Sequence, residues 1–282
     1  MDTQFWGPSA WKLLHMASFN LTPVSASASA PAPELNAEQF GDFISFFTVL
    51  PYILPCKFCR SSLTDYYKEL PLKSCKTKQD VIKWVYDIHN RVNNKLRHQK
   101  LPVSPDPTLE QVIDRYTKHP ATITDYWNFI FAVGYNHPFE AEINSSPIPN
   151  CPTNVLNSRS ACTRNKWNIL STEQRMKYYR LFWKYLPDIF DNETRRLWID
   201  ALSKSFYTPT VLNNRNSVME WLWKMRCIIQ PTFHDPYKTL CKKISMHSSE
   251  CNSQDSAGLK TCRRKTIIMK NTMKNTMKNI GK

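Results

Sequence analysis

Residues 43–63 read FISFFTVLPYILPCKFCRSSL, and this stretch decides the fold. An apolar run has two prolines near its end. It is followed by two cysteines, Cys56 and Cys59, which are separated by two residues. A CxxC pair can belong to a zinc site, a structural disulfide or a redox centre. In a thioredoxin-like protein the pair would follow a strand of a βαβ unit. Here the apolar residues before the pair recur at helical spacing, which disfavours that fold and predicts a helical protein.

The composition agrees with a helical protein, because only five of the 282 residues are glycine and nine are tryptophan. The N-terminus, MDTQFWGPSAW, lacks a basic region followed by an apolar run, so we expect no signal peptide. The longest apolar stretch, FISFFTVLPYIL, is too short to span a bilayer. We therefore expect a soluble protein made in the cytosol, where a cysteine pair is more often catalytic than structural.

The formal net charge of +15 is concentrated near the C-terminus. From Lys238 onward, eleven lysines and arginines face only Glu250 and Asp255, a net charge of +9. The chain ends with the repeat MKNTMKNTMKN, which predicts a disordered tail. This tail offers at most non-specific attraction to nucleic-acid phosphates, so we favour a solvated tail over a nucleic-acid-binding one.

Helical periodicity predicts five helices in the first 120 residues. The first begins near Gly7 as N-cap, with Pro8 at the first helical position. A capping-box pattern of Thr108 and Gln111 opens the short fifth helix, which ends near Lys118. The three helices between them are predicted over residues 37–50, 56–69 and 78–96. We expect an antiparallel four-helix bundle with a short fifth helix.

A further helix is predicted over residues 121–135, and a polar, proline-rich connection follows it. A second set of helical patterns comes after this connection, over residues 172–186, 188–205 and 215–229. The chain then divides into a first domain (1–120), a second all-helical domain of unknown role (121–245) and a basic tail (246–282).

The cysteine pair lacks the partners that a zinc site requires. No second CxxC occurs, and Cys75 and His89 lie on other predicted elements, so we predict no metal. A pair at a helix start has a reason to be redox-active, because the free N–H groups and the helix dipole stabilise a thiolate. Lys57 adds a cation nearby. The alternative is a pair of small, buried apolar residues without chemistry.

A second informative stretch is WVYDIHNRVNNKL, residues 84–96. His89 and Asn93 are four residues apart and share a helix face, with Asn90 beside them and Trp84 about a turn away. A face that is both polar and aromatic suits a planar heteroaromatic ligand carrying ribose and phosphate groups.

Together these residues resemble the Erv/ALR family of flavin-dependent sulfhydryl oxidases over roughly residues 1–120. The family pattern is W-G-x-x-x-W-x-x-x-H on the first helix, C-x-x-C at the third and H-N-x-V-N-x-x-L on the fourth. The matching residues are Trp6, Gly7, Trp11 and His15, then Cys56 and Cys59, then His89, Asn90, Val92, Asn93 and Leu96. With its extra C-terminal domain, the chain is most similar to the mimivirus-type members from giant DNA viruses.

The resemblance implies a thiol oxidase that forms disulfides in protein substrates and passes electrons through FAD to oxygen, giving hydrogen peroxide. Cys59 would be the cysteine next to the flavin, and Cys56 the one that meets incoming dithiols. Lys95 would lie near the FAD phosphates, and Arg115 and Tyr116 near the flavin, where relatives often carry Arg-Trp. The remaining residues that would bind FAD are Trp6, Gly7, Trp11, His15, Trp84, His89, Asn90 and Asn93.

The resemblance also implies a homodimer formed through the first helices and a location in the host cytoplasm or the virion, without membrane insertion. Many relatives join the fourth and fifth helices by a C-x16-C disulfide, but Tyr86 and Val103 stand at these positions. Packing or the second domain must therefore hold the fifth helix.

Family members often carry a shuttle cysteine pair outside the core. The candidates are Cys151 with Cys162, and Cys241, Cys251 and Cys262, although unreactive cysteines are an equal alternative. The competing function is a helical structural protein, or a nucleic-acid- or virion-binding protein, with a non-catalytic CxxC.

Overall fold

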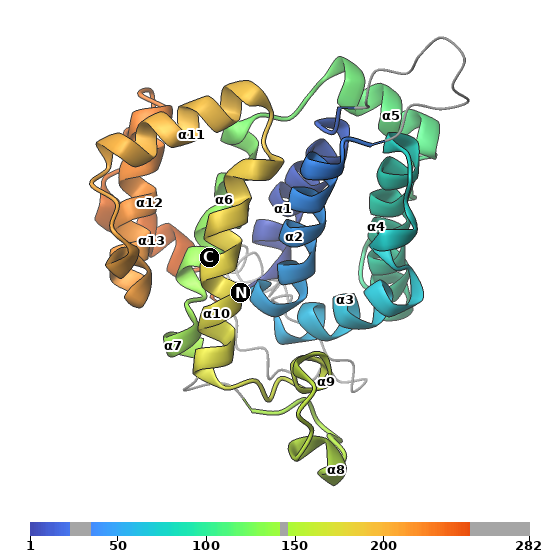
Figure 1. The fold of residues 1–282 in the computed structure, drawn as a ribbon. Helices are drawn as coiled ribbons and strands as arrows, with labels where there is room; N and C mark the ends of the chain where they lie inside the picture. The colour runs from blue at the N-terminus through green and yellow to red at the C-terminus, as the bar shows by residue number, and fades with distance from the viewer. Residues whose placement is uncertain (23–34, 142–145, 249–282) are drawn as a thin grey trace, which may run out of the picture.

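The structure, a computed structural model, describes residues 1–22, 35–141 and 146–248. Within these ranges it contains helices and no β-strand, which confirms the all-helical class (Figure 1). The elements of the first part are α1 (Thr3–Phe19), α2 (Ala37–Ile53), α3 (Lys57–Glu69), the 3₁₀ helix η1 (Leu72–Ser74), α4 (Lys78–His98) and α5 (Leu109–Lys118). Those of the second part are α6 (Ile123–Tyr135), α7 (Pro138–Ala141), α8 (Thr153–Leu156), α9 (Ala161–Lys166), α10 (Thr172–Tyr185), η3 (Leu186–Ile189), α11 (Asn192–Lys204), η4 (Pro209–Asn213), α12 (Arg215–Ile229) and α13 (Tyr237–Ser245).

Side-chain caps fix where the helices of the first part begin. The Asn36 side chain accepts from the first turn of α2, and Thr77 and Asp80 form a capping box at α4. Thr108 and Gln111 form the capping box predicted for α5. These caps satisfy backbone N–H groups that have no partner inside the helix, so the starts of α2, α4 and α5 fall close to the predicted positions.

The predicted start of the first helix is wrong. Asp2, not Gly7, is the N-cap of α1, and its carboxylate accepts a hydrogen bond from the backbone N–H of Gln4 at 2.9 Å. Glycine has no side-chain acceptor, whereas an aspartate at an N-cap provides one. Pro8 lies inside the helix, where its missing N–H leaves only the Gln4 carbonyl without its intrahelical bond.

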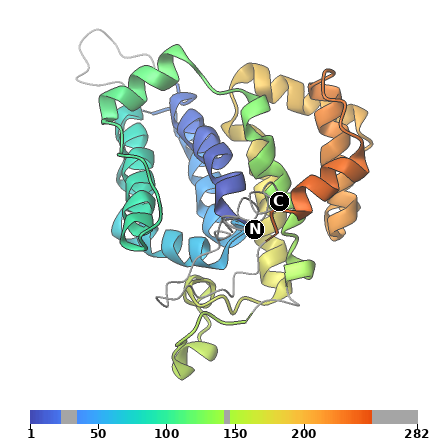
Figure 2. The same cartoon turned by 180° about the vertical axis from the view of Figure 1, so that it is seen from behind.

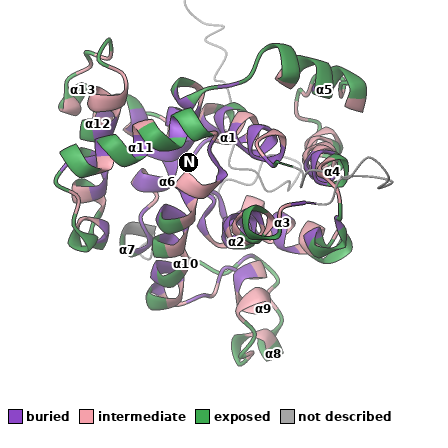
Figure 3. Cartoon of the chain, turned by 45° about the horizontal axis from the view of Figure 1, so that its top comes forward, coloured by how far each residue is buried: buried purple, intermediate pink, exposed green. Residues whose placement is uncertain are grey.

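Helices α6 and α10 lie between the first five helices and the layer formed by α11, α12 and α13 (Figures 1 and 2). Helix α6 packs against α1 on one side and α12 on the other, and α10 packs against α2. Figure 3 shows α6 buried on most of its surface, in agreement with its run of buried residues from Phe129 to Gly134. A helix that is apolar nearly all round belongs in a protein interior.

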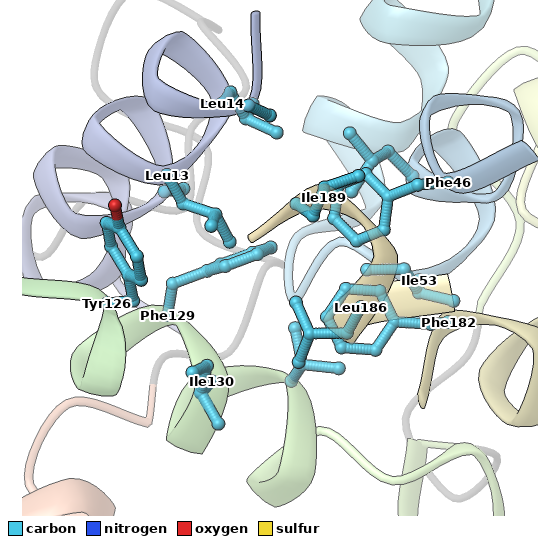
Figure 4. Packing of buried hydrophobic residues seen from close by; sticks show 14 of the residues in the cluster. Leu13, Leu14, Phe46, Ile53, Tyr126, Phe129, Ile130, Phe182, Leu186 and Ile189 are labelled. Atoms are coloured by element: carbon cyan, nitrogen blue, oxygen red, sulfur yellow. The ribbon is translucent and has the colours of Figure 1, made fainter. Parts of the chain in front are cut away.

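One continuous cluster of buried apolar side chains joins the two parts of the chain. Leu13 of α1, Phe46 of α2, Phe129 of α6 and Phe182 of α10 meet in it (Figure 4). The rings of Phe46 and Phe129 each lie about 6 Å from that of Phe182, with centroid distances of 5.6 and 6.0 Å. The core therefore crosses residue 120, and the proposed domain boundary there stays a prediction.

The second part differs from the sequence prediction in its short elements. The helix predicted over 188–205 is a 3₁₀ turn, η3, followed by α11, because Asp191 caps a new helix after Pro187. Helices α8, α9 and α13 were not predicted, and the first two are only four and six residues long. Such short helices give little periodic signal in the sequence.

The predicted disordered tail falls largely outside the described residues, since only its first residues, to Ser248, are described. Cys251 and Cys262 lie there as well. In the described part of the chain, no helix combines the length and apolar character needed to cross a membrane.

Candidate active site at the Cys56–Cys59 pair

The turn between α2 and α3 presents the cysteine pair. Helix α2 ends at Ile53, and Cys56 is the N-cap of α3, with its sulfur accepting a hydrogen bond from the Cys59 N–H at 3.2 Å. Both cysteines are free thiols. Cys56 is only 2% exposed, whereas Cys59 is half-buried one helical turn later. The pair thus has the helix-start position that favours a thiolate.

The surroundings of the two thiols favour ionisation of Cys56. Burial raises the pKa of Cys56, but the hydrogen bond from the Cys59 thiol and the charge of Lys95 outweigh it and lower the pKa to about 6. The pKa of Cys59 is raised well above its ordinary value, because its thiol donates to Cys56 and is itself buried. Lys95 of α4 is held at the start of α3 by donating to Ser62 Oγ at 2.5 Å and to the Phe58 carbonyl at 3.3 Å. Near neutral pH these surroundings favour a thiolate at Cys56 and a thiol at Cys59.

A cavity of about 530 Å³ opens beside Cys59. Helices α1, α3 and α4 form most of its wall, and α5 contributes two residues. Its volume falls in the range of small-molecule and cofactor sites. The residues predicted for the site that line it are Cys59, Trp6, Gly7, Trp11, Trp84, His89, Asn93, Lys95, Arg115 and Tyr116.

Stacked rings join α1, α4 and α5 at one end of the cavity. Trp11 stacks on His89 with a centroid distance of 3.9 Å and an interplanar angle of 10°. His15 Nε2 lies 3.1 Å from His89 Nδ1, and the His15 ring stacks on Tyr116 at 5.0 Å. Burial lowers the pKa of His15 to about 3 and that of His89 to about 4, so both rings are neutral at pH 7.

Three of the predicted site residues do not line the cavity. Cys56 is the N-cap of α3, and only Cys59 of the pair lines the cavity. His15 is buried and reaches the site through its contact with His89. Asn90 is half-buried on α4 and does not line the cavity, so its predicted role stays a prediction.

Hydrogen bonds hold α5 beside α4 in place of the absent disulfide. The Tyr86 hydroxyl donates to the Pro107 carbonyl at 3.1 Å. Asp106 accepts from the Asn93 amide at 2.7 Å and from the Arg97 guanidinium. We expected packing or the second domain to hold the fifth helix, and the structure shows these polar contacts between α4 and the α4–α5 loop.

Several cavity residues were missed in the sequence. Ser62, Leu63 and Tyr67 of α3 line the cavity together with Cys59. They follow Cys59 at three, four and eight residues, the spacing of one helix face, so extending the helical pattern from the cysteine would have found them. Lys12 of α1 also lines the cavity, but it pairs with Asp125 of α6 at 2.5 Å, a partner that no local pattern reveals. Among the described residues there is no group of three or more metal-binding side chains.

Comparison with known proteins gives matches to one family. Residues 8–116 match the model of the Erv1/Alr family. The mitochondrial FAD-linked sulfhydryl oxidase of Saccharomyces cerevisiae is 30% identical over 99 residues, 35% of this chain and 47% of the relative. A probable FAD-linked sulfhydryl oxidase of Acanthamoeba polyphaga mimivirus is 28% identical over 95 residues, 33% of this chain and 59% of the relative. An FAD-linked sulfhydryl oxidase of African swine fever virus is 29% identical over 91 residues, 32% of this chain and 67% of the relative.

The chain spans about half the length of the first of these relatives, and no solved structure matches it. The matched segment contains both cysteines and the rings of Trp11, His15, His89 and Tyr116. Residues 8–116 of this chain are therefore similar to the Erv1/Alr family.

Proposed function

We propose that this chain is an FAD-dependent thiol oxidase, which converts two thiols of a protein substrate into a disulfide and reduces oxygen to hydrogen peroxide. The observation that carries the proposal is the position of Cys59, at the wall of a cofactor-sized cavity and one turn after the thiolate-forming Cys56. The names of the three relatives, all FAD-linked sulfhydryl oxidases, support it.

The cavity has the features that FAD requires. Trp6 lines it, and its buried indole N–H has no hydrogen-bond partner among the described residues, so a donor is available to a ligand. Trp11, His89 and Tyr116 offer flat aromatic surfaces, while Lys95 and Arg115 supply positive charge for phosphates. These residues would hold FAD, which when bound supplies a two-electron acceptor for the cysteine pair and passes the electrons to oxygen.

The two cysteines have different roles in disulfide exchange. A substrate thiolate attacks Cys56 Sγ of the oxidised pair, the Cys56–Cys59 bond breaks, and its electron pair leaves on Cys59 beside the cavity. The second substrate thiolate then attacks the substrate sulfur of the mixed disulfide and releases the Cys56 thiolate. A Cys56 pKa of about 6 makes this sulfur a good leaving group at pH 7. Because Cys56 is buried and the Met1 amino group bonds the Pro55 carbonyl at 2.9 Å above this turn, substrate entry requires the N-terminal residues to move.

A spectroscopic and an oxygen-consumption measurement test the proposal. The purified full chain is expected to show flavin absorbance in the visible range and to consume oxygen with dithiothreitol. Cys59→Ser is expected to keep the flavin and to abolish oxygen consumption, because the thiol at the cavity wall is lost. Cys227→Ser, on α12, is the control and is expected to retain activity. A chain purified without flavin that also binds no added FAD contradicts the proposal.

The partners and setting belong to the same proposal. Protein dithiols are the substrate class, and the mimivirus and African swine fever virus relatives support a role in viral protein oxidation, in the host cytoplasm or the virion. The expected homodimer stays a prediction, and it would need surfaces other than the sides of α1 and α2 that α6 and α10 cover. Nucleic-acid binding by the basic tail also stays a prediction.

A shuttle pair remains part of the proposal as well. Cys151 and Cys162 are half-buried free thiols flanking α8 and on α9, and α9 packs against α3, the helix that begins after Cys56. Cys241, on α13, is a third half-buried free thiol.

A further inference from the structure

A buried guanidinium adjoins the redox pair and is not explained by the cofactor site. Arg60 directly follows Cys59, is 5% exposed and does not line the cavity. Its Nη1 donates to the Leu54 carbonyl at 2.8 Å, and its Nη2 donates to Asn168 Oδ1 at 2.5 Å. Through these hydrogen bonds Arg60 links three segments: the turn before the cysteines, the first turn of α3 and the loop between α9 and α10.

The acceptors of Arg60 are neutral oxygen atoms. Within the described ranges, no carboxylate forms an ion pair with its guanidinium. A buried charge without a counter-charge is strongly unfavourable, so a negative group nearby would stabilise it. Burial lowers the pKa of Arg60, whereas the charges of Cys56 and Cys59 act in the opposite direction. The Leu54 carbonyl that accepts from Arg60 Nη1 also accepts from the Cys56 N–H at 2.8 Å, so the guanidinium lies beside Cys56. We take the Cys56 thiolate as its counter-charge.

Asn168 holds the guanidinium from the second part of the chain. This residue is buried and has a left-handed backbone conformation, with φ of 60°, which asparagine adopts more readily than most residues. Its Oδ1 accepts from both Arg60 and Arg175 of α10, and its Nδ2 donates to the Ser146 carbonyl at 3.0 Å. The side chain is therefore fixed at both ends, and its oxygen is aimed at Arg60.

We propose that Arg60 is a positioning residue of the Cys56–Cys59 pair, and that its positive charge, held in place by Asn168, stabilises the thiolate and so the reduced form of the pair. This inference rests on the proposed thiol oxidase function. Three other groups act on the Cys56 thiolate: Lys95 from α4, the Met1 amino group and the Cys59 thiol. Arg60 differs from them because its anchor, Asn168, lies outside residues 8–116, which match the family model.

The consequence is a shift in the redox equilibrium. When two glutathione molecules reduce the Cys56–Cys59 disulfide, the pair takes up two electrons and becomes one thiolate and one thiol. Glutathione becomes its disulfide, and one proton is released. A cation that stabilises the thiolate favours the reduced pair, which makes the disulfide form a stronger oxidant of substrate dithiols.

The test is an anaerobic glutathione titration of the full chain, together with the thiolate ultraviolet absorbance as a function of pH. In Arg60→Gln we expect the midpoint pH of the thiolate titration to rise by about one unit. We also expect the ratio of disulfide to reduced pair, at a given ratio of glutathione to its disulfide, to rise by up to about tenfold. Arg60→Lys keeps the charge and is expected to stay within about twofold of wild type. A stably folded Arg60→Gln with both quantities unchanged overturns the inference.

A second variant and a control guard against a simple folding effect. Asn168→Asp keeps Arg60 but pairs it with a carboxylate, so we expect the thiolate titration and the glutathione equilibrium to shift in the same direction as in Arg60→Gln. If Arg60→Gln does not fold, wild-type values of both quantities in Asn168→Asp overturn the inference. The control is Asn165→Ala, because Asn165 donates to the Pro51 carbonyl and to Thr64 Oγ1 in the same interface but does not contact Arg60. It is expected to lower the melting temperature without moving the titration. Neither readout uses flavin, so failure to bind FAD would count against the proposed function and not against this inference.

Discussion

His15 and His89 form a pair in which one imidazole donates a hydrogen bond and the other accepts it, across 3.1 Å. The His15 ring is buried and the His89 ring is half-buried, and Arg115 also lies near His15. A second proton on this pair would break the hydrogen bond and place a charge in an apolar site. The two histidines therefore make the folded state sensitive to acid.

The first prediction concerns the stability of the protein below neutral pH. Unfolded histidine binds a proton near pH 6.5, but the folded pKa values are about 3 for His15 and about 4 for His89, so the unfolded state takes up protons first as the pH falls. The free energy of unfolding should therefore fall between pH 6.5 and 4, by about 1.4 kcal/mol per pH unit for each histidine. Denaturant unfolding across this range measures the slope.

Replacing one of these histidines should flatten the slope. His15→Gln removes one of the two proton-linked groups, while the exposed His119 offers a matched control, His119→Gln. Equal slopes for wild type and His15→Gln would show that the buried pair does not cause the acid sensitivity.

At the scale of elements, helix α5 depends on a few polar contacts outside itself. It supplies Arg115 and Tyr116 to the cavity, although only Val112 among its residues is buried. The loop before it is held to α4 by Asp106 and by the hydroxyl of Tyr86. The position of these two cavity residues thus depends on the loop contacts, together with the stacking of Tyr116 on His15.

The second prediction is that Asp106→Ala loosens α5. Loss of the bonds to Asn93 and Arg97 should raise amide hydrogen exchange in α5 and weaken FAD retention, with a stability loss of about 1 kcal/mol or less, since the pair is partly exposed. Asp114→Ala is the control, because Asp114 pairs only with Lys118 on the exposed side of the same helix. If both variants exchange at the wild-type rate in α5, the loop contacts do not hold the helix.

Predictions from the sequence were most accurate for features that depend only on neighbouring residues. Helical spacing and capping patterns predicted α4, α5 and α12 closely, because a cap and an apolar stripe are properties of neighbouring residues. The resemblance to the Erv/ALR family likewise led to Trp11, His89 and Asn93, which line one cavity, and to His15, which contacts His89. Asn168 could not be predicted, since its role arises from a contact with Arg60, 108 residues away. The start of α1 was missed because a plausible Gly-Pro signal competed with Asp2.

At the scale of the whole molecule, the two parts of the chain share their interior. Ser9 of α1 donates to the Asp125 carbonyl at 2.5 Å and accepts from the Phe129 N–H at 3.2 Å, so polar as well as apolar contacts join α1 to α6. Trp6 connects this interface with the cavity, because its ring lies 5.9 Å from Phe129 while it also lines the cavity wall. Damage to the interface should therefore reach the cofactor site.

The third prediction is a single cooperative unfolding transition. Phe129→Ala should lower the free energy of unfolding by about 3–5 kcal/mol, as expected for a large aromatic ring removed from a core, and calorimetry should show one transition at a lower temperature. Phe206→Ala, at a side chain that is 90% exposed, is the control of the same residue type. Two transitions, of which only one responds to Phe129→Ala, would instead support two independent domains.

The shared interior also sets an order of events on the ribosome. Helices α1 and α2 are synthesised long before α10, and at about 5–20 residues per second the interval is on the order of ten seconds. During this interval the nascent chain presents Leu13 and Phe46 without the helices that later cover them. Cys56 and Cys59 are likewise synthesised before Asn168 has been added to the chain. Chaperone capture of the early helices, and the pace of translation through α6 and α10, would then determine how much of the protein matures.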